Sequence, residues 1–315
     1  MKTPVAMVGY SRSWTLSRSL DRIAECAGVQ DRDVYLYLDA PGRDEDVPAC
    51  DEMRQVAEAK RATVLPRLHV IRRARNYGVP GNIIEAITEV VNRFGRVIFF
   101  EDDDCVSRTF LTYMDEALDL YEADARIFCI NGHHPVTAVL PLLFRDDVFL
   151  TLRNHAWGFG IWKDRWNAVD FEMRDWEVFK ADPRNLAKLT AAGCDLREMV
   201  EDQLAGRIHT WDVQCTFHMV KNGLFAVEPR RSMTKNIGFG ENAVHCVSVE
   251  PYMMAARYYD FQPELPKHLT YHKSLTNSIS HALVPQTLLE RLHRKRLVIL
   301  SRARSGLSNE MPMSV

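Results

Sequence analysis

Short apolar runs alternate with longer helical patterns through the first half of the chain, and this alternation limits the folds that it can adopt. The runs that have the character of strands are PVAMVGY (4–10), VYLYLD (34–39), LHVIRR (68–73) and RVIFF (96–100). The helical patterns between them are the Leu16/Leu20/Ile23 stripe, VPACDEMRQVAEAKRA (47–62) and NIIEAITEVVNRF (82–94). A β-α-β-α order predicts an α/β fold with a mostly parallel sheet flanked by helices.

The second half of the chain is less regular. Its predicted elements are a strand at 126–132, a helical segment at 183–205, a helix at 211–223, a strand LFAVEP and a polar loop at 230–246. We expect one domain, 1–250, made of two halves, 1–125 and 126–250, followed by a helical extension, 251–304, and a disordered tail, 305–315.

The charge balance argues against a nucleic-acid partner. The chain has 40 Lys and Arg against 42 Asp and Glu, so its formal net charge of −2 gives no general attraction for a polyanion. The seven cysteines form no CxxC pair and their number is odd, which is typical of a reducing cytoplasm. The N-terminal apolar run is too short for a signal sequence, and no uncharged apolar stretch could span a bilayer. We therefore expect a cytoplasmic protein.

Polar side chains follow three of the predicted strands. Ser11 and Arg12 come after the first strand, Asp39 after the second, and four consecutive carboxylates, Glu101–Asp104, after the fourth. Because ligands bind outside the carboxyl ends of the strands in open α/β sheets, these side chains are expected to converge on a ligand there. The Gly-rich phosphate patterns GxGxxG and GxxxxGK[ST] are absent from the first β-α turn, so a phosphorylated ligand would need a metal ion and arginine.

The acidic run Glu101–Asp104 needs compensation, because adjacent carboxylates beside a buried strand repel one another and lose hydration. A divalent cation, Mg²⁺ or Mn²⁺, that also binds a diphosphate is the favoured interpretation, since such a cation needs only one or two protein carboxylates. The alternative is an acidic turn that caps a helix beginning near Ser107.

The order of several motifs resembles that of nucleotide-sugar-dependent, inverting glycosyltransferases of the GT-A fold. These motifs are Ser11–Arg12, Asp39, Asn76–Gly78, Glu101–Asp102–Asp103 and Trp211–Asp212. The segment FFEDDDCVSRTFLTYMDEAL is similar to the acidic segment of the N-acetylglucosaminyltransferase I family. The segment WDVQCTFHMVKNGLFAVEPRRSMTKNIGFGENAVH is similar to the C-terminal half of bacterial sugar transferases, and the resemblance covers about residues 4–246.

The resemblance implies a donor site in the first half of the chain. Asp103 would be the principal metal ligand, Arg12 would contact the diphosphate, and Asp39 would hydrogen-bond the base, which is uracil in a UDP-sugar. The other members of the nucleotide-sugar set are Ser11, Asn76, Glu101 and Asp102. The two acids among them would orient the ribose, the sugar or metal-bound water.

The resemblance also implies an acceptor side, where Asp212 matches the general base of the family. His245 stands where many GT-A enzymes have a histidine that contacts metal or diphosphate. A base is needed because a sugar hydroxyl is a weak nucleophile, whereas a metal ion and arginine stabilise the leaving diphosphate. The chain departs from the family pattern in Asp104, an additional acid, and in Trp211, where a glutamate often precedes the base.

Each of these assignments has a structural alternative. Asp212 could be the N-cap of a helix at 213–222, and Asp39 before Ala-Pro-Gly could nucleate a turn. Arg12 could pair with a surface acid, and His245 could be a structural histidine.

The segment WGFGIWKDRW (157–166) holds three tryptophans and two glycines in ten residues. Trp157, Gly158 and Trp211 are predicted to line the acceptor or sugar pocket, because aromatic rings pack on the apolar faces of sugars. The glycines permit close approach to a ligand and favour a substrate loop at 155–162. The alternative is that these aromatic side chains belong to the core.

The basic amphipathic segment at 287–304 could lie on an anionic membrane that carries a lipid-linked acceptor, or dock on the domain through its leucines. The sequence as a whole predicts an inverting transferase of hexosyl or N-acetylhexosaminyl groups, with a UDP-sugar as the expected donor and a glycan, polysaccharide or glycolipid hydroxyl as the acceptor. The alternatives are a non-catalytic nucleotide-sugar-binding scaffold and a sugar-phosphate nucleotidyltransferase, whose Gly-rich N-terminal loop this chain lacks.

Overall fold

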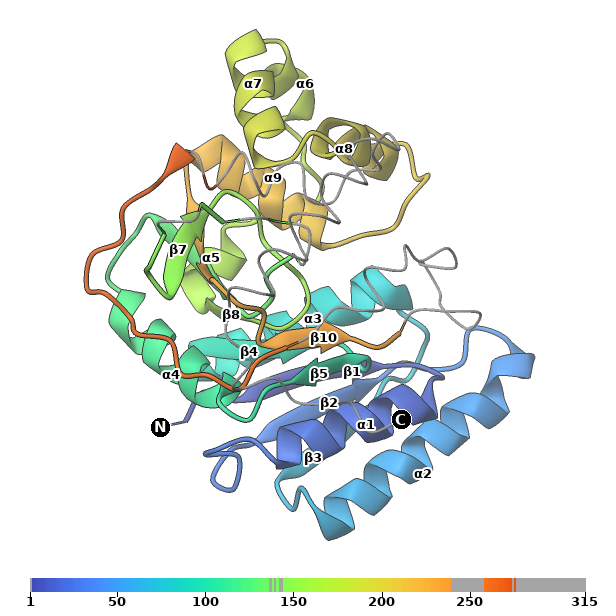
Figure 1. Ribbon diagram of the computed structural model, residues 1–315. Helices are drawn as coiled ribbons and strands as arrows, with labels where there is room; N and C mark the ends of the chain where they lie inside the picture. Colours follow the sequence, from blue (N-terminus) through green and yellow to red (C-terminus); the bar gives the residue numbers. More distant parts are fainter. Residues whose placement is uncertain are drawn as a thin grey trace, which may run out of the picture.

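The computed structural model describes residues 2–135, 138, 140, 141, 144–238, 258–273 and 275 of the chain. Within these residues the backbone forms an eight-stranded sheet in the order β3-β2-β1-β4-β8-β6-β9-β7 (Figure 1). Its strands are β1 (Val5–Gly9), β2 (Val34–Leu38), β3 (Leu68–Arg72), β4 (Arg96–Phe100), β6 (Ile127–Asn131), β7 (Val148–Thr151), β8 (Phe159–Trp162) and β9 (Phe225–Pro229). The predicted α/β fold with a mostly parallel sheet is confirmed.

The four N-terminal strands are parallel, and the direction changes where β8 enters the sheet. β8 pairs antiparallel with both β4 and β6, β9 runs parallel to β6, and β7 forms the edge antiparallel to β9. The predicted substrate loop at 155–162 is therefore wrong for its second half, which is a central strand. A Cβ on Gly160 would lie only 3.0 Å from Leu118 Cδ1, so this glycine allows a helix to pack closely on the sheet.

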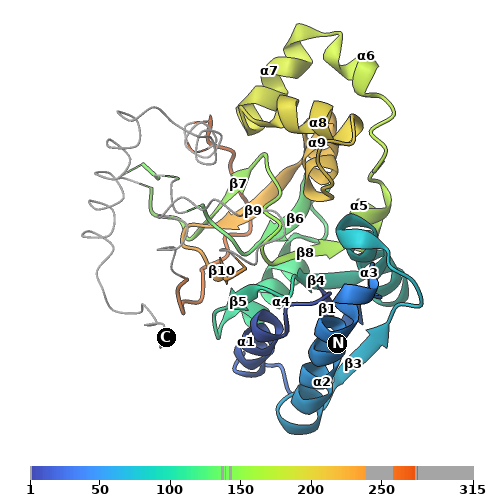
Figure 2. The same cartoon turned by 90° about the vertical axis from the view of Figure 1, so that its right-hand side faces the viewer.

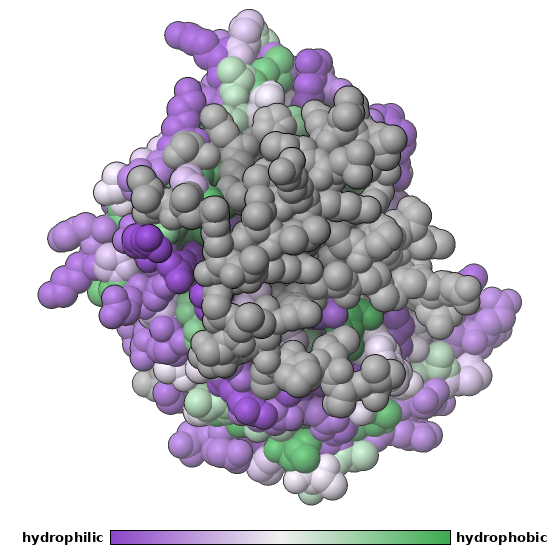
Figure 3. Space-filling view, in the orientation of Figure 1, coloured by the Kyte–Doolittle hydropathy of each residue, from purple (hydrophilic) through white to green (hydrophobic). Residues whose placement is uncertain are grey.

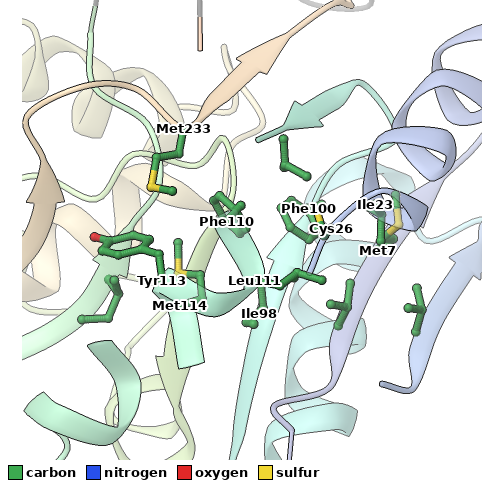
Figure 4. Packing of buried hydrophobic residues seen from close by; sticks show 14 of the residues in the cluster. Met7, Ile23, Cys26, Ile98, Phe100, Phe110, Leu111, Tyr113, Met114 and Met233 are labelled. Atoms are coloured by element: carbon green, nitrogen blue, oxygen red, sulfur yellow. The ribbon is translucent and has the colours of Figure 1, made fainter. Parts of the chain in front are cut away.

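Helices cover both faces of the sheet. The α-helices of the described residues are α1 (Ser13–Ala24), α2 (Val47–Thr63), α3 (Gly78–Phe94), α4 (Phe110–Tyr121), α5 (Lys163–Asn167), α6 (Trp176–Lys180), α7 (Pro183–Ala192), α8 (Leu196–Leu204) and α9 (Asp212–Asn222). The apolar sides of α1, α2 and α4 pack on one face, and those of α3, α5 and α9 on the other. On the first face, the rings of Phe110 in α4 and Phe100 in β4 pack with their centroids 5.0 Å apart (Figure 4).

Helices α6, α7 and α8 pack on α9 and form a helical lobe that projects beyond the sheet (Figures 1 and 2). The buried side chains of the lobe include Trp176, Phe179, Leu189 and Phe217. The predicted helical segment 183–205 is in fact two helices, because the extended backbone of Gly193 ends α7 three residues before α8 begins.

A second, two-stranded sheet joins distant parts of the chain. β5 (Asp104–Val106) follows directly on the first acidic residues and pairs antiparallel with β10 (Thr234–Asn236). The backbone N–H of Ile237 then donates to the carbonyl of Asp103 over 2.8 Å. Part of the predicted polar loop at 230–246 is therefore a strand, and it holds the acidic segment in place.

A buried ion pair fastens the start of the sheet to α4. Arg32, which is 1% exposed, donates from Nη2 to Asp115 Oδ2 over 2.7 Å and from Nη1 to Asp115 Oδ1 over 3.2 Å. Arg32 also donates to the carbonyl of Thr3, whose own N–H donates to Asp115 Oδ1 over 3.1 Å. The pair thus ties together the N-terminal segment, the turn before β2 and α4.

Three predictions lie outside the described residues: the role of His245, the placement of 287–304 and the disorder of 305–315. Among the helices that the structure describes, none is long and apolar enough to cross a membrane. Five of the cysteines within the described ranges are free thiols, namely Cys26, Cys50, Cys105, Cys129 and Cys215. Hydrophilic side chains predominate around the margin of the face drawn in Figure 3.

Candidate active site

The acidic segment meets Arg12 at the carboxyl edge of the sheet. Arg12 follows β1, whereas Asp102 and Asp103 follow the neighbouring strand β4. A single guanidinium nitrogen of Arg12, Nη2, lies 2.5 Å from Asp102 Oδ1 and 2.7 Å from Asp103 Oδ2. Burial acts to lower the pKa of Arg12, but the two carboxylates outweigh it and raise that pKa. The two carboxylates therefore converge on one cationic point.

The acidic segment does not cap the helix that follows it. α4 begins at Phe110, with Thr109 at the N-cap position and no side-chain cap hydrogen bond. Between the acids and this helix lies β5, so the carboxylates belong to the sheet edge and to Arg12.

Residues 236–238 close over Asp103. Asn236 Nδ2 donates to Asp103 Oδ1 over 2.7 Å, and the N–H of Gly238 donates to Asn236 Oδ1 over 2.8 Å. A Cβ on Gly238 would collide with Asp103 Oδ2 and with Arg12 Nη1, so the close approach depends on glycine. Sequence reasoning missed both residues, because only the pairing of β10 with β5 brings them to the acidic segment.

Burial raises the pKa of three of the four consecutive carboxyl groups. The pKa of Asp102 rises to about 7 although Arg12 opposes the change, and repulsion from Asp103 adds to the effect. Burial and the charge of Asp103 also raise the pKa values of Glu101 and Asp104 well above their ordinary range. Asp104 is completely buried: its Oδ2 accepts from the N–H of Glu101 over 3.1 Å, and its Oδ1 has no hydrogen-bond partner among the described residues.

These raised pKa values predict that the metal-free protein loses stability as the pH rises. A carboxyl group with a higher pKa in the folded state stabilises the fold below its unfolded pKa of about 4, and that stability is lost as the pH rises through the folded pKa. Asp104→Asn removes one such group. Between about pH 4.5 and 7.5 its free energy of unfolding should therefore fall less than that of the wild type.

Urea unfolding in EDTA at the two pH values measures this difference. Asp51→Asn is the matched control, because Asp51 is an exposed acid on α2 and its replacement should leave the decline with pH unchanged. An equal decline in Asp104→Asn and in the wild type would contradict the prediction.

Asp39 and Asn76 hold the neighbouring loop together. The carboxylate of Asp39 accepts from the backbone N–H groups of Ala40 at 3.0 Å, and of Tyr77 and Gly78 at 2.9 Å each, where α3 begins. Asn76 Nδ2 donates to the carbonyl of Ala40 over 2.6 Å. Burial raises the pKa of Asp39, and these N–H groups oppose the rise. Asp39 thus organises a turn, and its contact with a base stays a prediction.

Asp212 is the first residue of α9, and Trp211 takes the N-cap position without a side-chain cap bond. The N-cap alternative for Asp212 is therefore not what the structure shows. Burial raises the pKa of Asp212, whereas the positive charge of Arg153 and the nearby His155 oppose the rise. The ring of Trp211 meets that of Phe99 in β4 edge-on at 5.6 Å, so the start of α9 lies next to the strand that leads into the acidic segment. Repulsion from Asp212 accordingly contributes to the raised pKa of Glu101.

A buried cluster of histidines and a glutamate, which the sequence analysis missed, lies beside Asp212. Glu228 in β9 is completely buried, with Oε1 2.7 Å from His134 Nδ1 and Oε2 3.1 Å from His155 Nε2. The contact with His155 lacks hydrogen-bond geometry, so both of its atoms keep unused bonding capacity within the described part of the chain. Burial acts to raise the pKa of Glu228, but the histidines bring it down to about 2. Because the three residues come from separate segments, no local spacing could have indicated the cluster.

The predicted sugar-pocket residues separate into two environments. Gly158 has a φ of +75°, and a Cβ there would lie 2.8 Å from Thr234 Cγ2, so both backbone and space require glycine. The ring of Trp157 meets that of His133 edge-on at 4.5 Å, next to the histidine cluster. Trp211 is 4% exposed and its ring stacks on Phe159 at 5.3 Å, which is the core placement offered as the alternative.

The donor set at the sheet edge fits a divalent cation held by two carboxylates. Asp102 and Asp103 converge on Arg12 Nη2, and a cation could take that point if Arg12 withdraws. Among the residues that the structure describes, no group of three or more His, Cys, Asp and Glu side chains is placed to hold a metal ion. Phosphate oxygens and water would complete the coordination, as is usual for Mg²⁺.

No family model matches the sequence, and no curated protein matches it. Among solved structures, the chain is similar to S. aureus TarS 1–349, with 17% identity and a TM-score of 0.37 over 54% of this chain and 50% of that chain. It is similar to the galactosyltransferase LgtC in complex with donor and acceptor sugar analogs, with 11% identity and a TM-score of 0.40 over 97% and 98% of the two chains. It is also similar to mouse xyloside xylosyltransferase 1, with 9% identity and a TM-score of 0.38 over 71% and 82%. The match thus spans half the length of TarS 1–349, and similarity at this level carries no conclusion about ligands or reaction.

Proposed function

We propose that this chain is a nucleotide-sugar-dependent glycosyltransferase that moves a sugar, with inversion, from a UDP-sugar to a hydroxyl of a glycan, polysaccharide or glycolipid. The observation that carries the proposal is the convergence of Asp102 and Asp103 on one nitrogen of Arg12, at the sheet edge that also faces Asp212. This arrangement supports a cation site at Asp102 and Asp103 and a separate base at Asp212.

On the donor side, the pair of carboxylates and Arg12 suit a diphosphate. A divalent cation, Mn²⁺ or Mg²⁺, at Asp102 and Asp103 would neutralise the charge that the leaving diphosphate develops. Arg12, released from the carboxylates, is long enough and permanently charged, so it would pair with phosphate oxygens. Asn236 would keep Asp103 oriented through its hydrogen bond to Oδ1.

On the acceptor side, Asp212 suits the general base. The acceptor oxygen forms a bond to the anomeric carbon. At the same time the bond from that carbon to the diphosphate oxygen breaks, and the diphosphate oxygen keeps the electron pair. The proton of the acceptor hydroxyl passes to the carboxylate of Asp212. A carboxylate whose pKa is raised by burial accepts a proton more readily than an exposed one, which favours this role.

A thermal-shift titration tests the donor half of the proposal. UDP, GDP, CMP and their sugar conjugates are each added with Mn²⁺, Mg²⁺ or EDTA to the wild type and to Asp103→Asn. A uridine nucleotide with metal at ~100 times its Kd stabilises the folded state by about 2.7 kcal/mol and should raise the melting temperature by about 5 °C. Asp103→Asn should abolish this shift, because it removes one of the two converging carboxylates.

The matched control is Asp119→Asn, an exposed acid on α4 whose side chain is 64% accessible and remote from Arg12. Its metal-dependent shift should equal that of the wild type. If no nucleotide shifts the wild type, or if the shift is the same in EDTA, the metal-assisted transferase proposal is wrong. If binding occurs but no sugar is transferred to any acceptor, the chain binds nucleotide-sugars without catalysing transfer.

A further inference from the structure

Arg153 links the helical lobe to the sheet. It follows β7, is 6% exposed, and donates from Nη1 to Asp195 Oδ1 over 2.7 Å and from Nη2 to Asp195 Oδ2 over 3.0 Å. Asp195 lies between α7 and α8 of the lobe. A bidentate arginine–carboxylate pair fixes the orientation of the guanidinium more firmly than a single contact would.

The lobe is shaped to admit this ion pair. A Cβ on Gly193 would lie 2.5 Å from Arg153 Nη1 and 2.6 Å from Asp195 Oδ1, so any larger residue would displace the bridge. The extended backbone of Gly193 suits every residue type, and space alone therefore requires glycine. The absence of a side chain at this position makes room for the guanidinium.

The segment that carries Arg153 runs along the first turns of α9. The N–H of Asn154 donates to Thr216 Oγ1 over 3.3 Å, and Leu152 packs on the cluster that contains Val213 and Phe217. These contacts place the segment along the first turns of α9, the helix that begins at Asp212. The charges of Arg153 and His155 act to lower the pKa of Asp212 against the effect of burial. Among the described residues, Glu101 of the acidic segment and Cys215 of α9 also interact electrostatically with Asp212. Glu228 stands behind His155.

We propose that Arg153, clamped by Asp195 in the space left by Gly193, is a positioning residue that holds a fixed positive charge beside Asp212. The inference rests on the proposed function, since it assigns a role within the same site. Arg153 is the one permanent cation among the described groups named above, and its charge opposes the effect of burial on the Asp212 carboxyl. The lobe is then part of the catalytic machinery, because it keeps this cation in place.

The pH dependence of turnover tests the inference. In Arg153→Met the long apolar side chain is retained and the charge is lost, so Asp212 takes up a proton at higher pH. The acid limb of the kcat/KM profile should move up by about one pH unit. Arg153→Lys retains the charge, and its acid limb should stay within about 0.3 pH unit of the wild type. An unchanged acid limb in Arg153→Met overturns the inference.

Two further variants separate charge from fold. Gly193→Ala leaves Arg153 in the chain but pushes the guanidinium away, so its acid limb should move in the same direction by a smaller amount. Asp195→Asn leaves the positive charge in the site, so the acid limb should not move upward. If Gly193→Ala behaves as the wild type, the clamp has no part in the effect.

A measurement without turnover distinguishes failure of this inference from failure of the proposed function. The cost of Arg153→Met in free energy of unfolding is compared in the wild type and in Asp212→Asn near pH 7.5. A charge interaction makes the cost larger when Asp212 is present, whereas a purely packing role gives equal costs. Equal costs overturn the inference even if sugar transfer is found. Unequal costs with no sugar transfer support the contact while the transferase proposal fails.

Discussion

Replacing Asp212 by asparagine is expected to lower kcat by about 10³-fold while the metal-dependent stabilisation by nucleotide is retained. Asparagine has nearly the same shape but cannot accept the proton of the acceptor hydroxyl. The proposed donor contacts are those of Arg12, Asp102 and Asp103, which this substitution leaves in place, so nucleotide affinity should change little. Initial rates at saturating donor and acceptor, together with thermal-shift titrations, measure the two quantities.

Asp182→Asn is the matched control for this prediction. Asp182 caps α7 by accepting from the N–H of Arg184 over 2.9 Å, and asparagine caps helices about as well as aspartate. This variant should retain activity within about twofold. If Asp212→Asn also retains activity near the wild-type level, Asp212 is not the base and another group must accept the proton.

Arg32→Met is expected to lower the free energy of unfolding by about 3–5 kcal/mol, the cost of leaving one partner of a buried ion pair alone. Arg32 is 1% exposed, and its loss leaves the carboxylate of Asp115 without its main donor. Thr3 and Lys2 would still reach Asp115, but Lys2 lies 3.5 Å away and is half exposed. Urea unfolding at neutral pH measures the change.

The double variant Arg32→Met/Asp115→Leu separates the pair from its surroundings. Replacing both partners by apolar side chains of similar size removes the unpaired charge, so most of the lost stability should return. If the double variant is as unstable as Arg32→Met alone, the cost comes from packing and not from the charge.

The same ion pair makes the stability of the fold depend on pH under acidic conditions. Burial acts to raise the pKa of Asp115, but the hydrogen bonds from Arg32 and Thr3 outweigh it and lower that pKa below its ordinary value. A carboxyl group with a depressed pKa in the folded state stabilises the fold above its unfolded pKa of about 3.9. That stability is lost as the pH falls below this value, and in Asp115→Leu the corresponding loss should disappear.

Local sequence predicted the N-terminal half of the fold well, because there periodicity and burial agree. β4 was predicted with its observed bounds, 96–100, because a short apolar run between a helix and a charged turn is typical of a buried strand. β8 was misjudged because Gly158 and Gly160 resemble loop residues when the sheet around them is unknown. In the folded chain a side chain at Gly158 would crowd Thr234, and one at Gly160 would crowd Leu118. Neither contact can be recognised from the local sequence.

The candidate site shows the same division between local and distant signals. Arg12 and the acidic run could be placed at one sheet edge because strand order alone brings them there. Asn236, Glu228 and Arg153 could not, because each reaches the site through pairing or packing with residues far away in the sequence. Polar residues of this kind carry no periodic signal, and only the tertiary contacts identify them.

The pairing of β5 with β10 has a consequence for the order of events at the ribosome. Asn236 follows Asp103 by 133 positions in the chain. At about 5–20 residues per second, translation needs ~7–27 s to make this stretch, and during that time the nascent acidic segment lacks the strand that will flank it. Four neighbouring carboxylates would then repel one another in an unfinished pocket, with Arg12 as the cation already synthesised. The acidic segment therefore reaches its final packing only late, when β10 pairs with β5 and Asn236 reaches Asp103.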